Sequence, residues 1–347
     1  MKKENFQGYR QEVHCIMEQG SVNERCLTRS VIKHIRKHNK ALNTGAAVGN
    51  DYASFNLGEN SSIVWSDGVS DDPFLAWTKA LNNLAVSGGT ILGARIAFLC
   101  PENTKESQIK EYMKVFNCLA DDSGIQIMGG HTEISKVHND ISFVVNVLGI
   151  CGSYCAKTKS IEPGFDIIMT KYAGIMGGDR LARINHDQLC GRFAKSYVES
   201  AYVDRNMFSI SKEAKILSNR GDVYYMHDVS CGGIYGALWQ LGSKINHGIE
   251  IRHNNIFIKQ ETIEIAEFFN INPYMLDGTG SLIAVVENGE SAVNELNEAG
   301  IPSAVIGKVS SGKERFVVIE PTGEKRFLSP VNGDEIYKII GGMRCEY

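Results

Sequence analysis

The spacing of hydrophobic residues along the chain changes repeatedly between the period of a strand and the period of a helix. The stretches SSIVWSDGVSDDP and ISFVVNVLGI are rich in β-branched and aromatic residues and predict two strands. Between them, NTKESQIKEYMKVFNCLADDSG predicts a helix with Asn103 as its cap, Glu106 three residues later and Gly124 as its stop. Apolar residues at helical spacing should form its buried face, namely Ile109, Tyr112, Met113, Phe116 and Leu119.

The second half of the chain shows the same alternation. The stretch GDVYYMHDVSCGGIYGALWQLGSK predicts a strand, a polar turn with paired glycines and a helix, and a strand, a helix and a strand are predicted further on. This order indicates an α/β fold in both halves. A chain of 347 residues is also longer than one core usually organises. We expect a helical segment over 1–44, a first domain over 45–155 and a second over 156–347.

Composition and charge exclude several classes of protein. The net charge is −4 and the signs are interspersed, which argues against binding to nucleic acid. The N-terminus lacks the apolar segment of a secretory signal, and no apolar run is long enough to cross a membrane. The nine cysteines are scattered, and Cys151 and Cys155 have no second pair to complete a zinc site. These features predict a cytoplasmic protein with reduced thiols and no membrane partner.

Two stretches place paired glycines beside polar side chains. In QIMGGHTEIS, Gly129 and Gly130 precede His131, Thr132 and Glu133. We read this stretch as a strand that runs into a turn. Glycines let a backbone approach a ligand closely. This pattern is therefore typical of a site for an anion or a metal ion.

In MHDVSCGG, Asp228 precedes Gly232 and Gly233, and a helix is predicted to follow. Free amides at a helix start favour phosphate. A carboxylate needs Mg²⁺ between itself and a phosphate.

The N-terminal half supplies further oxygen ligands. Asp51 follows Gly49 in AAVGNDYASF, Asp67 ends a predicted strand, and LNNLAVSGG carries Asn82 and Asn83. Each of these turns taken alone is more typical of a purely structural turn, because Asp and Gly are favoured turn residues. Neither a Walker loop nor a Rossmann fingerprint is present. Taken together with the His-Thr-Glu cluster, they indicate a site for a magnesium nucleotide.

The order of these motifs is also similar to that of a known family. VGNDYASF, WSDGVSDD, NNLAVSGG, GGHTEIS, PGFDIIMTKYAG, MHDVSCGGIYGALW, KQETIEIAEFFNINPYML and GTGSLI resemble the AIR synthase-like ATP-binding superfamily. Within it, the chain is most similar to the branch of HypE-like hydrogenase maturation factors. The resemblance runs from about residue 45 to the C-terminal RFLSPVNGDEIYKII.

The resemblance implies a two-domain α/β (α+β) fold in a homodimer. The N-terminal domain would contribute strands to a dimeric β-barrel, and ATP with Mg²⁺ would bind between the domains and near the dimer interface. Members of the family use ATP to activate an amide- or acid-type oxygen by phosphoryl transfer. In the hydrogenase branch, a carbamoylated C-terminal cysteine is dehydrated to a thiocyanate, which implies a partner protein of hydrogenase maturation.

The resemblance also assigns roles to residues. The expected catalytic residues are Asp228 and, as proton carriers, His131 and His227; a structural hydrogen-bonding role is the alternative for each histidine. The expected metal ligands are Asp51, Asp67, Asn83 and Glu133. The residues expected to bind the nucleotide are Gly49, Asp51, Gly129, Gly130, Thr132, Lys171, Gly232 and Gly233.

Three departures from the family pattern leave the activity open. The usual Asn-Asp pair is Asn82-Asn83 here, Ser230 and Cys231 replace Thr and Glu, and two residues follow Cys345 at the C-terminus. An ordinary terminal thiol is therefore the preferred interpretation of Cys345. The retained acids favour an ATP-dependent enzyme. The alternatives are a catalytically weak dimeric partner protein, which Asn83 and Cys231 favour, and a small-molecule kinase like thiamine-monophosphate kinase.

Overall fold

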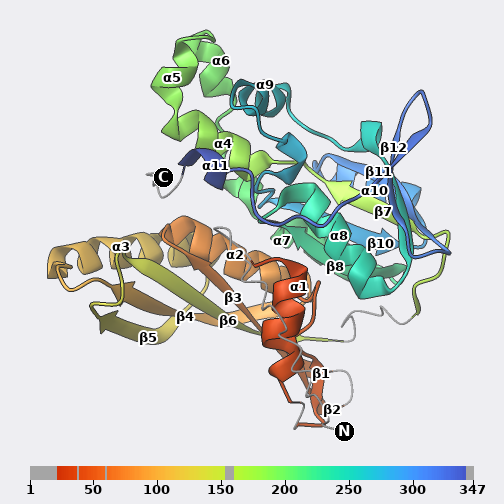
Figure 1. Ribbon diagram of the computed structural model, residues 1–347. Helices are drawn as coiled ribbons and strands as arrows, with labels where there is room; N and C mark the ends of the chain where they lie inside the picture. The colour runs from red at the N-terminus through yellow and green to blue at the C-terminus, as the bar shows by residue number, and fades with distance from the viewer. Residues whose placement is uncertain (1–21, 37–38, 59–60, 153–159, 341–347) are drawn as a thin grey trace, which may run out of the picture.

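The structure, a computed structural model, describes residues 22–36, 39–58, 61–152 and 160–340. Two sheets with their helices form two domains that lie one above the other (Figure 1). A short helical segment precedes them, formed by α1 (Glu24–Cys26), η1 (Leu27–Val31) and η2 (Ile32–His34). No helix in the described part of the chain is long and apolar enough to cross a membrane.

The first domain is one mixed sheet with two helices on one face (Figure 1). Its strand order is β1-β2-β3-β6-β4-β5, and the only parallel pair in this sheet, as described, is β4 with β5. In chain order its elements are β1 (Leu42–Thr44), β2 (Ala53–Gly58), β3 (Ser61–Ser70), α2 (Pro73–Ala85), β4 (Thr90–Cys100), α3 (Glu106–Ser123), β5 (Ile127–Ile134) and β6 (Ser142–Cys151).

The predicted helix of this domain begins two residues later than expected. Asn103 does not cap α3, because the helix begins at Glu106 and the backbone N–H of Lys105 donates to Gln108 Oε1. Its end is confirmed, since Gly124 takes the left-handed conformation with φ 66°. Phe116 and Leu119 are buried as predicted, but Met113 is exposed.

The second domain is a sheet of order β13-β12-β9-β11-β7-β10-β8, antiparallel except for β9 with β12. Its strands are β7 (Asp166–Thr170), β8 (Val223–Val229), β9 (Gly248–Arg252), β10 (Ser281–Val286), β11 (Ser303–Ser310), β12 (Arg315–Ile319) and β13 (Glu324–Phe327). Its α-helices are α4 (Ile175–Ile184), α5 (His186–Cys190), α6 (Lys195–Ser200), α7 (Ser211–Ser218), α8 (Gly233–Ile245), α9 (Gln260–Phe268), α10 (Gly289–Glu298) and α11 (Tyr337–Ile340). The 3₁₀ turns are η4 (Arg205–Phe208), η5 (His253–Asn255) and η6 (Pro273–Met275).

Both faces of this second sheet are buried. Along β10, Leu282 and Ala284 belong to a core that includes side chains of α7 and α10, while Ile283 and Val285 pack with the side chains of α8. This explains why β10 is apolar at nearly every position instead of alternating.

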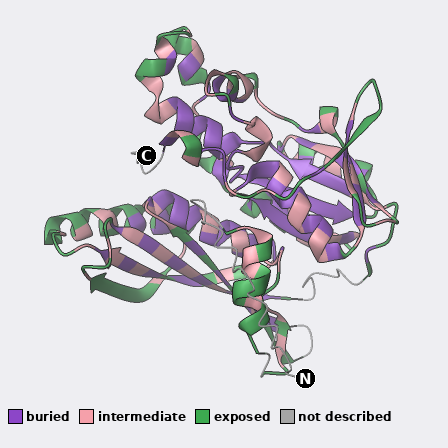
Figure 2. Cartoon of the chain, in the orientation of Figure 1, coloured by how far each residue is buried: buried purple, intermediate pink, exposed green. Residues whose placement is uncertain are grey.

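Helix α2 joins the two domains, because its side chains belong to a core that continues into the second domain. The rings of Phe74, on α2, and Phe208, in η4, meet edge to face with centroids 5.9 Å apart. Figure 2 shows α2 as one of the most buried helices and α3 as largely exposed. The first residues of α2 therefore form part of the domain boundary.

No described helix covers the other face of the first sheet. Along β3, Ser66 donates to Ala80 O in α2 and Gly68 lies directly beneath that helix, so Trp65, Asp67 and Val69 point the opposite way. Trp65 and Val69 are exposed. The described sheet is open, with β1 and β5 at its edges, and this single chain shows no closed barrel.

Candidate active site

A short segment of the first domain is bound to the second domain through Asp51. Asp51 Oδ2 lies 2.6 Å from His227 Nδ1 and 3.4 Å from the backbone N of Asp228, both in β8. Next to it, Tyr225 donates to Gly49 O over 2.5 Å. Gly49 has φ 73°, and a side chain there would crowd the Tyr225 hydroxyl and helix α8. The predicted residues Gly49, Asp51, His227 and Asp228 are thus brought together at the domain boundary.

The ligand atoms of Asp51, His227 and Asp228 all lie within 4.8 Å of one another. Both imidazole nitrogens are engaged, since Nε2 of His227 lies 2.9 Å from Gln240 Oε1. Asp228 Oδ2 is buried and has no hydrogen-bond partner among the described residues. Two carboxylates with an unused buried oxygen fit a hard cation such as Mg²⁺, and His227 fits the role of orienting Asp51.

The charges at this site change the protonation of both β8 residues. Burial by itself would lower the pKa of His227, but the charge and hydrogen bond of Asp51 raise it to about 9. Burial and the charge of Asp51 raise the pKa of Asp228 to about 7, against the opposing effect of His227 and Lys79. His227 is therefore a cation near neutral pH, and Asp228 is poised to hold or release a proton.

A second group of charges lies beside Asp228. Lys79, on α2, places Nζ 3.0 Å from Asp277 Oδ2 across the domain boundary. Asp334, in the segment before α11, is also buried, and burial and the charge of Asp277 raise its pKa to about 7. Sequence reasoning missed Lys79, Asp277 and Asp334. Lys79 lies in an apolar helix and Asp277 in the loop between η6 and β10, and neither belongs to a pattern that distinguishes it from a surface residue.

The predicted phosphate turn has a backbone that favours glycine, but one of its amides is already used. Gly232 and Gly233 have φ 84° and 62°, and a Cβ at Gly233 would lie 2.5 Å from Leu276 O. The backbone N–H of Gly232 donates to Asp334 Oδ2 over 2.8 Å. A carboxylate of the chain itself thus lies at the start of α8, where an anion was predicted.

The GGHTE stretch is not a turn, and that prediction was wrong. Residues 127–134 form the edge strand β5, parallel to β4, with a bulge opposite Ala94 and Arg95. A Cβ at Gly130 would lie 1.7 Å from Ile96 O, so Gly130 allows the close approach of the two strands. His131 Nε2 lies 3.0 Å from Glu133 Oε2, and both side chains are exposed.

The polar residues of this edge strand are not brought to Asp51. Gly129, Gly130, Thr132 and Glu133 are exposed along β5, at the edge of the first sheet. Figure 2 shows this strand as largely exposed. They contribute nothing to the carboxylate pair in this chain.

Asp67 lies inside β3 rather than at its end, because the strand continues to Ser70. Its side chain is on the uncovered face of the sheet, away from α2. Asn83 does meet it, but only by donating from Nδ2 to the backbone oxygen of Asp67 over 2.8 Å. The structure therefore does not bring the predicted metal ligands Asp67, Asn83 and Glu133 to Asp51.

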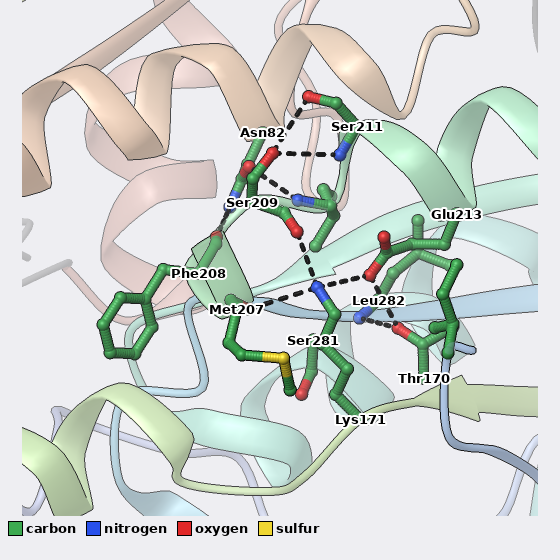
Figure 3. Close-up of polar contacts among 12 residues, drawn as sticks. Asn82, Thr170, Lys171, Met207, Phe208, Ser209, Ser211, Glu213, Ser281 and Leu282 are labelled. Carbon is green, nitrogen blue, oxygen red and sulfur yellow. Dashed lines mark hydrogen bonds and ion pairs between the residues drawn. The ribbon is translucent and has the colours of Figure 1, made fainter. Parts of the chain in front are cut away.

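Lys171 is enclosed in a buried network at the domain boundary (Figure 3). Its Nζ lies 2.7 Å from Glu213 Oε1 and donates to Met207 O and Ser209 O. Burial lowers the pKa of Lys171, although Glu213 opposes this shift. The ammonium of Lys171, which was predicted to bind phosphate, is thus bound to three oxygens of the protein itself.

Asn82 lies on the other side of the same loop. It donates from Nδ2 to Phe208 O over 2.9 Å and accepts at Oδ1 from Ile210 N over 3.2 Å. Its amide thus joins α2 of the first domain to the backbone of the second (Figure 3).

Comparison with known proteins decides the family. The model of the AIR synthase related protein N-terminal domain matches residues 74–151, and that of the C-terminal domain matches residues 162–320. The chain belongs to the AIR synthase related family. Its relatives include carbamoyl dehydratase HypE of Rhizobium leguminosarum bv. viciae, 21% identical over 87% of this chain and 89% of that protein. HypE of Azotobacter vinelandii is 20% identical over 84% and 87%.

Several solved structures share the fold. HypE in complex with ATP superposes with a TM-score of 0.64, at 18% identity, over 90% of this chain and 96% of that one. A HypE–HypF complex gives 0.67 at 17%, over 80% and 92%. Thiamine-monophosphate kinase of Stenotrophomonas maltophilia gives 0.61 at 18%, over 83% and 93%. At these identities the likeness shows the fold alone.

Proposed function

We propose that this AIR synthase related protein is an ATP- and Mg²⁺-dependent enzyme that activates an amide or acid oxygen by phosphoryl transfer. The observation that carries the proposal is the Asp51–Asp228 pair, in which one buried oxygen of Asp228 has no hydrogen-bond partner among the described residues, close to a left-handed glycine turn at a helix start. Oxygen ligands of this kind suit Mg²⁺ that also binds phosphate.

The residues of the site would position ATP and hold protons. Asp51 and Asp228 would hold Mg²⁺, which neutralises phosphate charge when it is bound. His227 keeps Asp51 oriented through Nδ1 and is itself fixed by Gln240. The Gly233 turn would place backbone amides close to the phosphates, and Asp334 would have to leave Gly232 for that amide to take part.

For the substrate, we propose carbamoyl dehydration like that of HypE, or a related reaction on a small-molecule amide or acid. The HypE relatives and the ATP-bound HypE structure support this choice. The fold shared with thiamine-monophosphate kinase keeps a small-molecule kinase as the second candidate. Cys345, the residue that a HypE-like reaction would modify, lies outside the described residues.

We further propose that the protein forms a homodimer through the uncovered face of the first sheet and works with a partner protein of hydrogenase maturation. Exposed apolar side chains on the strands of this sheet support the first part, namely Trp65, Val69, Leu92 and Ile150. The HypE–HypF complex supports the second. Light scattering, which gives the molecular mass in solution, tests the dimer. We expect the mass of a dimer for wild type and the mass of a monomer for Val69→Glu.

Calorimetric titration with ATP, with and without Mg²⁺, tests the function. Wild type should bind ATP with Mg²⁺ at micromolar concentration, Asp51→Asn should lose that binding, and Asp187→Asn, on exposed α5, should keep it. No heat at millimolar ATP would overturn the proposal and favour the partner-protein alternative.

A further inference from the structure

Cys190, in α5, lies beside a histidine that precedes it by one helical turn. Its Sγ is 3.6 Å from His186 Nε2, a hydrogen-bonding distance for a sulfur atom. Residues four positions apart share one face of a helix, so this contact follows from the spacing HDQLC. The thiol is half-buried and packs at the margin of a core cluster that includes Leu181 and Leu189. The helix and this packing therefore hold the sulfur against the imidazole.

The second nitrogen of the same imidazole contacts a carboxylate. His186 Nδ1 lies 3.0 Å from Asp187 Oδ1. When the imidazole is neutral, its proton lies on Nδ1, because the carboxylate can only accept, and the lone pair of Nε2 then faces the sulfur. The side chain of Asp187 is fully exposed, so water screens this pair and the carboxylate orients the ring only weakly. A thiol, a base and an orienting acid are the arrangement that activates a cysteine nucleophile.

A second thiol of the chain serves as a reference for the reactivity of Cys190. Cys118, on α3, is exposed and has no hydrogen-bond partner among the described residues. A small molecule can reach the half-buried sulfur of Cys190, but that sulfur is less accessible than the sulfur of Cys118. Exposure alone therefore predicts that Cys118 reacts faster. The imidazole of His186 predicts the reverse order, because a base that takes the thiol proton makes the sulfur more nucleophilic.

We propose that Cys190 is a modification site, at which His186 activates the thiol toward small electrophiles of the hydroperoxide class. The sulfur attacks one peroxide oxygen, so that an S–O bond forms and the O–O bond breaks. Sulfur is oxidised by two electrons to a sulfenic acid, and the hydroperoxide is reduced to an alcohol or to water. Nε2 of His186 takes the thiol proton and gives it to the departing oxygen. In Figure 1, α5 lies apart from β8, which carries Asp228, and the inference does not rest on the proposed function.

The reaction rates of individual thiols test this proposal. We would treat the full chain with hydrogen peroxide near neutral pH, trap sulfenic acid with dimedone and locate it by mass spectrometry of peptides. In wild type, Cys190 should be modified faster than Cys118. His186→Gln should slow the reaction at Cys190 by roughly 100-fold, the lower end of what a positioned base contributes, and leave Cys118 unchanged. Asp187→Asn should slow it less, and His138→Gln, in the loop between β5 and β6, is the matched control that should change neither rate.

Modification of Cys118 as fast as that of Cys190 in wild type would overturn the inference. An unchanged rate at Cys190 in a folded His186→Gln protein would also overturn it. If that variant did not fold, the order of the two thiols in wild type would still decide the question. Iodoacetamide, which alkylates thiols without oxidising them, is the second reagent and should also react faster at Cys190. Preference for Cys190 with iodoacetamide but not with peroxide would overturn the assignment to hydroperoxides. These rates require no ATP, so failure of the proposed function would leave them unchanged.

Discussion

His227 Nδ1 and Asp51 Oδ2 lie 2.6 Å apart although 176 positions separate them in the chain. With the bond from Tyr225 to Gly49 and the contact of Lys244 with Asn50, this pair fastens the segment before β2 onto the second domain. The carboxylate that would hold a metal ion is therefore positioned by an imidazolium of the other domain. The site is therefore complete only where the two domains meet.

The His227–Asp51 pair should make stability depend on pH. The folded pKa of His227, about 9, is above its ordinary 6.5, so the stabilisation is complete below pH 6.5 and is lost as the pH rises through 9. Urea unfolding at a series of pH values should show a decline across this window, on the order of 3 kcal/mol, in wild type but not in His227→Gln. Parallel curves for the two proteins between pH 6.5 and 9 would contradict the pair.

Replacing Lys171 should cost stability rather than nucleotide affinity. Lys171→Met leaves Glu213 buried without its cation, and we expect a loss of about 3–5 kcal/mol in the free energy of unfolding. Lys171→Met/Glu213→Gln should recover much of it. Lys308→Met, at an exposed ion pair, should change stability by less than about 1 kcal/mol. A tenfold weaker ATP affinity in a folded Lys171→Met protein would instead support the phosphate contact that the sequence predicted.

Asn82 should behave as a joint between the domains. Asn82→Ala leaves Phe208 O and Ile210 N without their partner inside the protein, which we expect to cost about 1–3 kcal/mol for each unsatisfied group. Asn83→Ala removes a single bond to Asp67 O at a less buried position and should cost less. Urea unfolding measures both, and equal losses would show that the joint is not where the contacts place it.

The glycine pair of the edge strand should be needed for strand pairing. Gly130→Ala brings a methyl group against Ile96 O, so β4 and β5 must separate, at an expected cost of about 1–3 kcal/mol. Amide hydrogen exchange should become faster over 127–134. Gly221→Ala, where nothing lies within 4 Å of the added Cβ, should have little effect. An unchanged rate of amide hydrogen exchange in Gly130→Ala would contradict this prediction, because the bulge of β5 would then accommodate the added methyl group.

The sequence predicted both domains as layered sheets and helices, because hydrophobic period and β-branched runs are local signals. It also predicted the strand, glycine turn and helix that hold His227, Asp228 and Gly233. The sequence did not distinguish Asp51, which lies in the site, from Asp67, which does not, because both occur in the same kind of polar stretch. The alternation of side chains along β3 places Asp67 on the face of the sheet away from α2. Glycines in GGHTE were taken for a turn because a bulge in an edge strand uses the same residues.

The contacts of Lys79 and Lys171 could not be predicted from sequence for a different reason. Whether a lysine pairs with Asp277, with Glu213 or with a phosphate depends on which loops the fold brings together. Lys79 and Asp277 are 198 positions apart, and no periodicity in the chain indicates a contact over such a separation. The resemblance to the family placed Lys171 in a shared sequence motif, but it gave no information about the residues that surround Lys171 in the structure.

The central claim is that Asp51 and Asp228 hold the metal ion of a bound nucleotide. The most direct test is pulsed electron paramagnetic resonance of the protein with Mn²⁺ and ATP, which detects phosphorus nuclei next to the metal. We predict phosphorus coupling in wild type and in the control Asp187→Asn, and its loss in Asp228→Asn at the same nucleotide concentration. An unchanged signal in Asp228→Asn, or none in wild type, would contradict the claim.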